Sequence, residues 1–152
     1  MSAAVLTCGL LVSTISCFHE RDTKVNVEGG NPPKFIMSGS GDLTQLRIGG
    51  PKKLREGIAG EPYIYWGIEF EKTDSERSIE ALSPITYGEV PRGYIQIYPE
   101  PSQAPPPLLE DELYQANVVT MNANGARLNF AIHKGKVVAN PTIRDGKPVF
   151  PD

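Results

Sequence analysis

The chain has 152 residues and a formal net charge of −3, from 15 Lys and Arg against 18 Asp and Glu. This balance leaves no basic surface that could collect phosphates, so we expect no nucleic-acid partner. No cysteine follows residue 17, and residues 34–139 hold a single histidine. An internal disulfide and a tetrahedral zinc site are therefore excluded for that stretch, and we predict no metal and no cofactor.

Residues 1–17, MSAAVLTCGLLVSTISC, carry no charged side chain, and charged residues follow from Glu20 onward. This apolar run is too short to cross a hydrocarbon core of roughly 30 Å, which takes about 20 apolar residues. It matches the apolar middle of a signal peptide, so we predict a signal peptide over 1–17. An uncleaved anchor or a buried core segment is the alternative.

The residues before Cys17 are Thr14, Ile15 and Ser16, and this segment resembles the bacterial lipobox, in which small residues precede an acylated cysteine. The resemblance implies cleavage before Cys17 and attachment of a lipid to it. The membrane is then a partner through the N-terminal lipid, and the protein lies in the cell envelope, at the outer membrane or the periplasmic face. Cleavage near Ser16 without acylation, which gives a secreted protein, is the alternative.

Two flanking segments are predicted to lie outside the folded domain. Residues 18–33 are mostly polar and are interrupted by two glycines and two prolines, which is typical of a flexible tether. Residues 140–152 contain three prolines and form a C-terminal tail, in which Asp145 and Gly146 could turn a small hairpin.

The domain at 34–139 has the period-two alternation of antiparallel strands. The clearest case surrounds the single tryptophan, where the apolar side chains are Ile64, Trp66, Ile68 and Phe70. We predict strands at 34–38, 46–48, 63–70, 85–90, 94–98, 114–121, 128–132 and 136–139. Turns are predicted at Ser38–Asp42, Asn124–Gly125 and Lys134–Gly135, and one or two helical turns at 73–82.

Seven or eight short strands in about 105 residues predict an all-β fold, an antiparallel two-sheet sandwich. A tryptophan in an early middle strand and a late strand that begins with Tyr114 and continues into a hairpin resemble immunoglobulin and fibronectin III domains. The resemblance implies the immunoglobulin or fibronectin III topology for this sandwich. A small open barrel or a jelly roll is the alternative.

Several shorter motifs allow a structural and a functional interpretation. The segment from Pro99 to Pro107 is interpreted as a stiff polyproline connector, or as a ligand for an aromatic groove. Lys52, Lys53 and Arg55 form a solvated loop or bind a small anion. The carboxylates at 110–112 are a solvated charge run or bind calcium, although their spacing is not that of a calcium loop.

We predict that the protein is not an enzyme. His133 is the only histidine of the domain, and no G-x-S-x-G nucleophile elbow occurs in the chain. A hydrolase built around His133 is the remote alternative.

The candidate binding residues are four tyrosines: Tyr63, Tyr65, Tyr94 and Tyr98. In the alternation described above they point away from the face that carries Ile64, Trp66, Ile95 and Ile97. On neighbouring strands they would form an exterior aromatic face that stacks on sugar rings or contacts a partner protein. The alternative is that they stabilise the sheet by cross-strand pairing, or are covered by the proline-rich segment.

The chain as a whole resembles small bacterial lipoproteins of unknown function. The favoured hypothesis is an envelope-tethered bacterial lipoprotein that acts as a non-enzymatic accessory or protein-interaction module, with an envelope protein or a glycan as its partner. The alternative is a secreted carbohydrate- or peptide-binding module that uses the tyrosine face.

Overall fold

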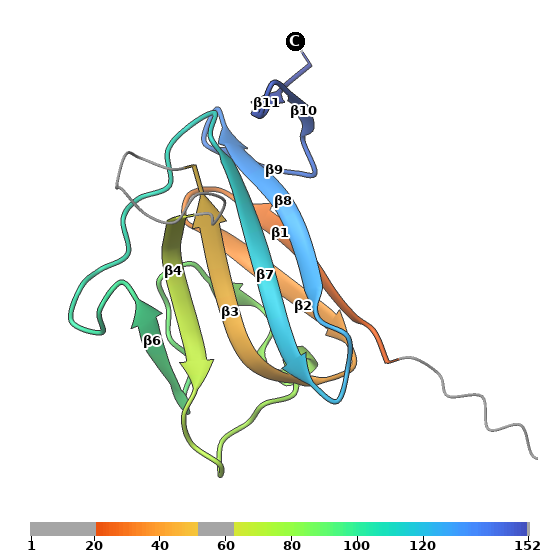
Figure 1. The fold of residues 1–152 in the computed structure, drawn as a ribbon, viewed down its shortest axis with the longest axis vertical. Coiled ribbons are helices and arrows are strands. Elements are labelled where there is room, and N and C mark those ends of the chain that lie inside the picture. The colour runs from red at the N-terminus through yellow and green to blue at the C-terminus, as the bar shows by residue number, and fades with distance from the viewer. Residues whose placement is uncertain (1–20, 52–62, 152) are drawn as a thin grey trace, which may run out of the picture.

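The structure, a computed structural model, describes residues 21–51 and 63–151, which form a sandwich of antiparallel sheets (Figure 1). The described strands are β1 (Thr23–Gly29), β2 (Pro33–Gly39), β3 (Asp42–Gly50), β4 (Tyr63–Phe70), β5 (Ile85–Thr86), β6 (Tyr94–Tyr98), β7 (Leu113–Met121), β8 (Ala126–His133), β9 (Lys136–Ala139), β10 (Thr142–Arg144) and β11 (Lys147–Val149). A short helix, α1 (Ile79–Leu82), precedes β5. Residues 1–17 with Cys17, the first part of the expected tether (18–20), and the basic residues Lys52, Lys53 and Arg55 lie outside the described ranges.

The strands form two facing sheets and a separate hairpin. The small sheet has the order β1-β2-β5, the large sheet has the order β6-β4-β3-β7-β8-β9, and β10 pairs only with β11. The order β1-β2-β5 opposite β3-β7-β8 corresponds to strands A-B-E and C-F-G of an immunoglobulin-type sandwich. The predicted two-sheet sandwich is confirmed, with more strands than the seven or eight that we expected.

The core lies between the two sheets, and its centre is aromatic. Phe35 of β2 stacks on Trp66 of β4, with ring centroids 6.5 Å apart, and meets Phe130 of β8 edge-on at 5.9 Å. All three side chains are fully buried. Tyr114, at the start of β7, accepts a hydrogen bond on its Oη from the backbone N–H of Leu109 at 2.8 Å, as in the tyrosine corner of immunoglobulin-type domains.

The tether expected over 18–33 is wrong for the described residues. β1 pairs with β2 along its whole length, from Thr23 opposite Gly39 to Gly29 opposite Pro33, and Val27 is buried. The glycines and prolines that suggested a linker form the turn between β1 and β2. The polar residues that alternate with the valines, Lys24, Asn26 and Glu28, face solvent, because only one face of the small sheet packs against the core.

The turns predicted from the sequence agree with the structure more closely than the predicted ends of the strands. Lys134 and Gly135 have φ angles of 51° and 73°, the left-handed pair that a tight hairpin requires between β8 and β9. A hairpin also forms around Asp145 and Gly146, between β10 and β11. By contrast, β5 is much shorter than the strand predicted at 85–90, because the chain turns at Gly88, where φ is 86°.

Candidate functional site

The four candidate tyrosines do not share one exterior face. Tyr65 and Tyr94 are only 5% and 6% exposed, whereas Tyr63 and Tyr98 are 44% and 45% exposed. The expectation that all four point away from the core is therefore wrong for Tyr65 and Tyr94. A β-bulge in β4 accounts for Tyr65, whereas Tyr94 lies in a regularly alternating part of β6.

The bulge in β4 turns Tyr65 inward. Ile48 of β3 lies opposite Trp66 and Gly49 lies opposite Ile64, so Tyr65 has no partner of its own and occupies the core beside Trp66. Its ring meets that of Tyr114 edge-on at 5.3 Å. Burial raises the pKa of Tyr65, and the nearby carboxylate of Glu112 raises it further.

On β6 the alternation was assigned one residue out of step, so that the residues expected to face solvent face the core. Tyr94 and Gln96 face the core, and Ile95 is 37% exposed. Tyr94 donates a hydrogen bond from its Oη to the carbonyl of Leu43 at 2.8 Å, and burial raises the pKa of Tyr94 to about 12. A polar residue is tolerated at the inner position because the Oε1 of Gln96 accepts a hydrogen bond from Trp66 Nε1 at 3.2 Å.

Gln96 also fixes the proline-rich segment to the sandwich. Its Nε2 lies within 3.2 Å of the carbonyl oxygens of Pro99 and Glu100 and 2.7 Å from that of Gln103. Further along, the Oη of Tyr87 donates to the carbonyl of Pro106 at 2.7 Å. The segment between β6 and β7 therefore packs against the domain through its own backbone carbonyls.

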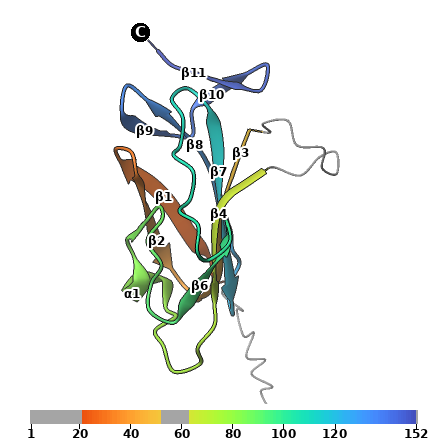
Figure 2. The ribbon, with the colours of Figure 1, turned by 90° about the vertical axis from the view of Figure 1, so that its left-hand side faces the viewer.

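The surface that remains accessible is the side of the large sheet that faces away from the small sheet. Figure 2 shows the small sheet and α1 on one side of the large sheet, and the other side is covered by no second sheet within the described residues. We call this side the outer face. Its side chains alternate with the buried ones on five strands: Gln45, Arg47 and Gly49 of β3, Gly67 and Glu69 of β4, Ile95 and Tyr98 of β6, Gln115, Asn117, Val119 and Met121 of β7, and Arg127 and Asn129 of β8.

Side-chain amides and arginines occupy the middle of the outer face. Gln115 donates from Nε2 to Asn129 Oδ1 at 3.1 Å, and Arg127 donates from Nε to Asn117 Oδ1 at 3.3 Å. Arg47 differs from Arg127, because its Nε is buried and has no hydrogen-bond partner among the described residues.

Apolar side chains lie beside this polar centre. Ile95, Tyr98, Val119 and Met121 are all more than a third exposed and account for half of the exposed large apolar side chains in the described residues. The ring of Tyr98 lies over Gly67, where an added Cβ would come within 3.3 Å of it. Of the four candidate tyrosines, only Tyr98 is among the residues of this face. The other residues of the outer face could have been found from the alternation, because they occupy the positions between the buried residues Leu46, Ile48 and Val118 and their neighbours.

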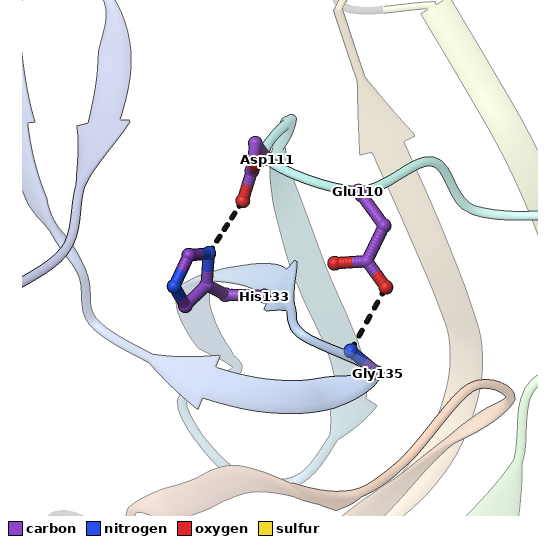
Figure 3. Close-up of polar contacts among 4 residues, drawn as sticks. All are labelled: Glu110, Asp111, His133 and Gly135. Carbon is purple, nitrogen blue, oxygen red and sulfur yellow. Dashed lines mark hydrogen bonds and ion pairs between the residues drawn. The ribbon is translucent and has the colours of Figure 1, made fainter.

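His133 has an acidic neighbour but no nucleophile. Its Nδ1 lies 2.6 Å from Asp111 Oδ1, and its ring stacks on Phe150 with centroids 4.0 Å apart. No hydroxyl or thiol side chain forms a hydrogen bond with His133 in the part of the chain that the structure describes. Figure 3 shows that Glu110 lies next to this pair and accepts a hydrogen bond from the N–H of Gly135 at 2.9 Å. Two of the three carboxylates at 110–112 thus hold the β8–β9 turn.

Neither a metal cluster nor a membrane-spanning helix is found within residues 21–51 and 63–151. No group of three or more His, Cys, Asp or Glu side chains gathers there, and no helix of those residues is long and apolar enough to cross a membrane.

In the comparison with known proteins, no family model, no curated protein and no solved structure matches this chain.

Proposed function

We propose that this chain is an envelope-tethered bacterial lipoprotein whose sandwich is a non-enzymatic protein-interaction module. The leader supports the location, because an uncharged run ends at Cys17 in a lipobox-like sequence. The outer face supports the interaction role and supplies the binding surface.

The observation that carries the interaction role is the composition of the outer face. Protein interfaces are enriched in Tyr, Met and Arg and depleted of Lys. The outer face carries Tyr98, Met121, Arg47 and Arg127, and the five strands that form it, β3, β4, β6, β7 and β8, contain no lysine. The remaining polar groups are mainly amides, which bind a partner without the desolvation cost of a buried charge.

A short connection to the lipid would also orient the sandwich. Arg21 is already fixed, because its carbonyl accepts a hydrogen bond from the N–H of Asn124 at 2.8 Å. Only three residues separate it from Cys17, which corresponds to a reach of about 14 Å when extended. The β7–β8 hairpin, which contains Asn124, would then lie nearest the membrane, and the strands of the outer face would lead away from the membrane surface.

The location is tested by mass spectrometry of the mature amino terminus, purified from the native host. We expect Cys17 as the first residue, bearing diacylglycerol, and a Cys17→Ser variant that loses the lipid and leaves the membrane fraction. Recovery of an intact Met1 from soluble cytosolic protein would overturn the proposed location.

The interaction role is tested by photo-crosslinking in the same host. A photoreactive residue in place of Asn117, on the outer face, is expected to give cross-linked protein products. The same residue in place of Lys24, which is exposed on β1, is the matched control and is expected to give none. Equal products from both positions, or none from Asn117, would contradict the use of the outer face.

The second candidate function is a carbohydrate- or peptide-binding module. One observation favours it: Tyr98 is 45% exposed and lies on a face rich in amides, the combination that stacks on and hydrogen-bonds to a sugar. A glycan array that compares the full chain with Tyr98→Ala decides this point, since glycan binding that depends on Tyr98 would favour this function over a protein partner.

A further inference from the structure

Two oppositely charged side chains of the outer face, Arg47 and Glu69, do not pair with each other, and its third charged side chain, Arg127, donates to Asn117. Arg47 lies opposite Gly67, and Glu69 lies opposite Gln45, so the two charged residues are diagonal neighbours on β3 and β4. Diagonal positions in a sheet are about 7–8 Å apart, within reach of long side chains. Neither Arg47 nor Glu69 nevertheless forms an ion pair with any of the described residues.

Arg47 in particular lacks a counter-charge. It is half-buried, its stem packs over Gly67 next to the ring of Tyr98, and its Nε is shielded from solvent without a hydrogen-bond partner in the described part of the chain. A shielded guanidinium N–H costs free energy until an acceptor reaches it. The acceptor that the outer face itself offers is a carboxylate, that of Glu69.

We propose that the partner of the outer face is a second copy of this chain, packed face to face so that Arg47 of each copy meets Glu69 of the other. This inference rests on the proposed use of the outer face as an interface. A two-fold contact is self-complementary, so one arginine and one glutamate on a single face supply two ion pairs. The exposed apolar side chains Ile95, Tyr98, Val119 and Met121 surround these charges.

The size of the outer face suits such a dimer. Five strands at a spacing of about 4.8 Å, and about 25 Å long, cover roughly 600 Å² in plan. This is close to the roughly 800 Å² per partner that stable protein interfaces bury. The two-fold axis runs between Arg47 and Glu69 and passes close to Gln45, so Gln45 would lie opposite its counterpart in the other copy.

The first test uses this position. The full chain carrying Gln45→Cys, expressed from its own leader, is expected to form a disulfide-linked homodimer in the envelope on mild oxidation. A Lys24→Cys variant, with the thiol on the small sheet, is the matched control and is expected to stay monomeric. Cross-linking of both variants to the same extent would mean random collision and would overturn the proposal.

The second test exchanges the charges in the Gln45→Cys background. Arg47→Glu or Glu69→Arg alone places like charges at both contacts, and each is expected to lower the cross-linked fraction about tenfold. Two differently tagged copies, one with each substitution, are expected to cross-link with each other, because both contacts again join opposite charges. Both substitutions within one chain are also expected to restore the homodimer, which separates a lost interface from a lost fold.

The outcomes distinguish this inference from the proposed function. An undiminished homodimer in Arg47→Glu, or no recovery in the paired variants, would overturn the dimer. If Gln45→Cys gives no homodimer while the photoreactive residue at position 117 captures other proteins, the outer face is an interface for a different partner. In that case the proposed function holds and this inference fails.

Discussion

Individual tyrosines make the sandwich sensitive to alkaline pH. Burial raises the pKa of Tyr94 and of Tyr114 to about 12. The positive charge of Arg77 acts in the opposite direction on Tyr94, and the hydrogen bond from the backbone of Leu109 does so on Tyr114. In the unfolded chain these phenols titrate near 10. Above that pH the unfolded chain binds fewer protons than the folded one, so the stabilisation from the raised pKa values is complete below pH 10 and is lost as the pH rises toward 12.

We therefore predict that the free energy of unfolding falls between pH 10 and pH 12. Urea denaturation followed by the fluorescence of Trp66 measures it at a series of pH values. Tyr94→Phe, which keeps the ring but has no proton to lose, is expected to reduce the slope. A free energy that is flat from pH 10 to 12, or a slope unchanged by Tyr94→Phe, would contradict the assignment.

At the scale of elements, the segment between β6 and β7 depends on one amide. Gln96 is 7% exposed and accepts from Trp66 while donating toward three carbonyls of that segment. We predict that Gln96→Leu destabilises the protein by about 3 kcal/mol, because it leaves several buried polar groups without partners. Gln115→Leu is the matched control. It breaks the single hydrogen bond to Asn129 on the outer face and should cost about 1 kcal/mol.

The measurement is urea denaturation of both variants at neutral pH, with tryptophan fluorescence reporting the environment of Trp66. Equal losses in the two variants would show that Gln96 is an ordinary polar contact and that other groups hold the segment.

The elements also show how far a sequence can predict this molecule. The strand content and the hairpins followed from alternation and from left-handed turn residues such as Gly135. The sequence did not predict which sheet face each side chain occupies. A bulge is a local backbone irregularity that no particular residue type marks, and it reverses the alternation beyond it. One extra residue in β4 turned Tyr65 into the core, and the alternation on β6 was assigned by the hydrophobicity of Ile95 although Gln96 has the better partners inside. The outer face was missed for the same reason, because facing decides which residues share a surface.

At the scale of the whole molecule, the two ends of the described chain differ in their attachment. β1 pairs with β2 over seven positions and buries Val27, and its first residue is tied to the β7–β8 hairpin by a hydrogen bond from Thr23 N–H to the carbonyl of Asn124 at 3.0 Å. The β10–β11 hairpin belongs to neither sheet, and its strand residues are nearly all exposed. In Figure 1 it lies beyond the end of the sandwich, near β8 and β9.

This difference gives a prediction about two deletions of comparable length. Removal of residues 142–152 keeps the buried Pro141 and takes away mainly the stack of Phe150 on His133, and an aromatic contact of this kind is worth about 0.5–1.5 kcal/mol. The shortened chain should therefore unfold cooperatively, with a urea midpoint close to that of the full chain. Removal of residues 21–32 exposes Phe35 and Met37, which β1 helps to bury. Because each buried side chain of this size contributes on the order of 2 kcal/mol, that chain should lose its cooperative transition. If residues 21–32 were the tether that their glycines and prolines suggest, their removal would leave the urea midpoint unchanged, and this result would contradict the pairing of β1 with β2.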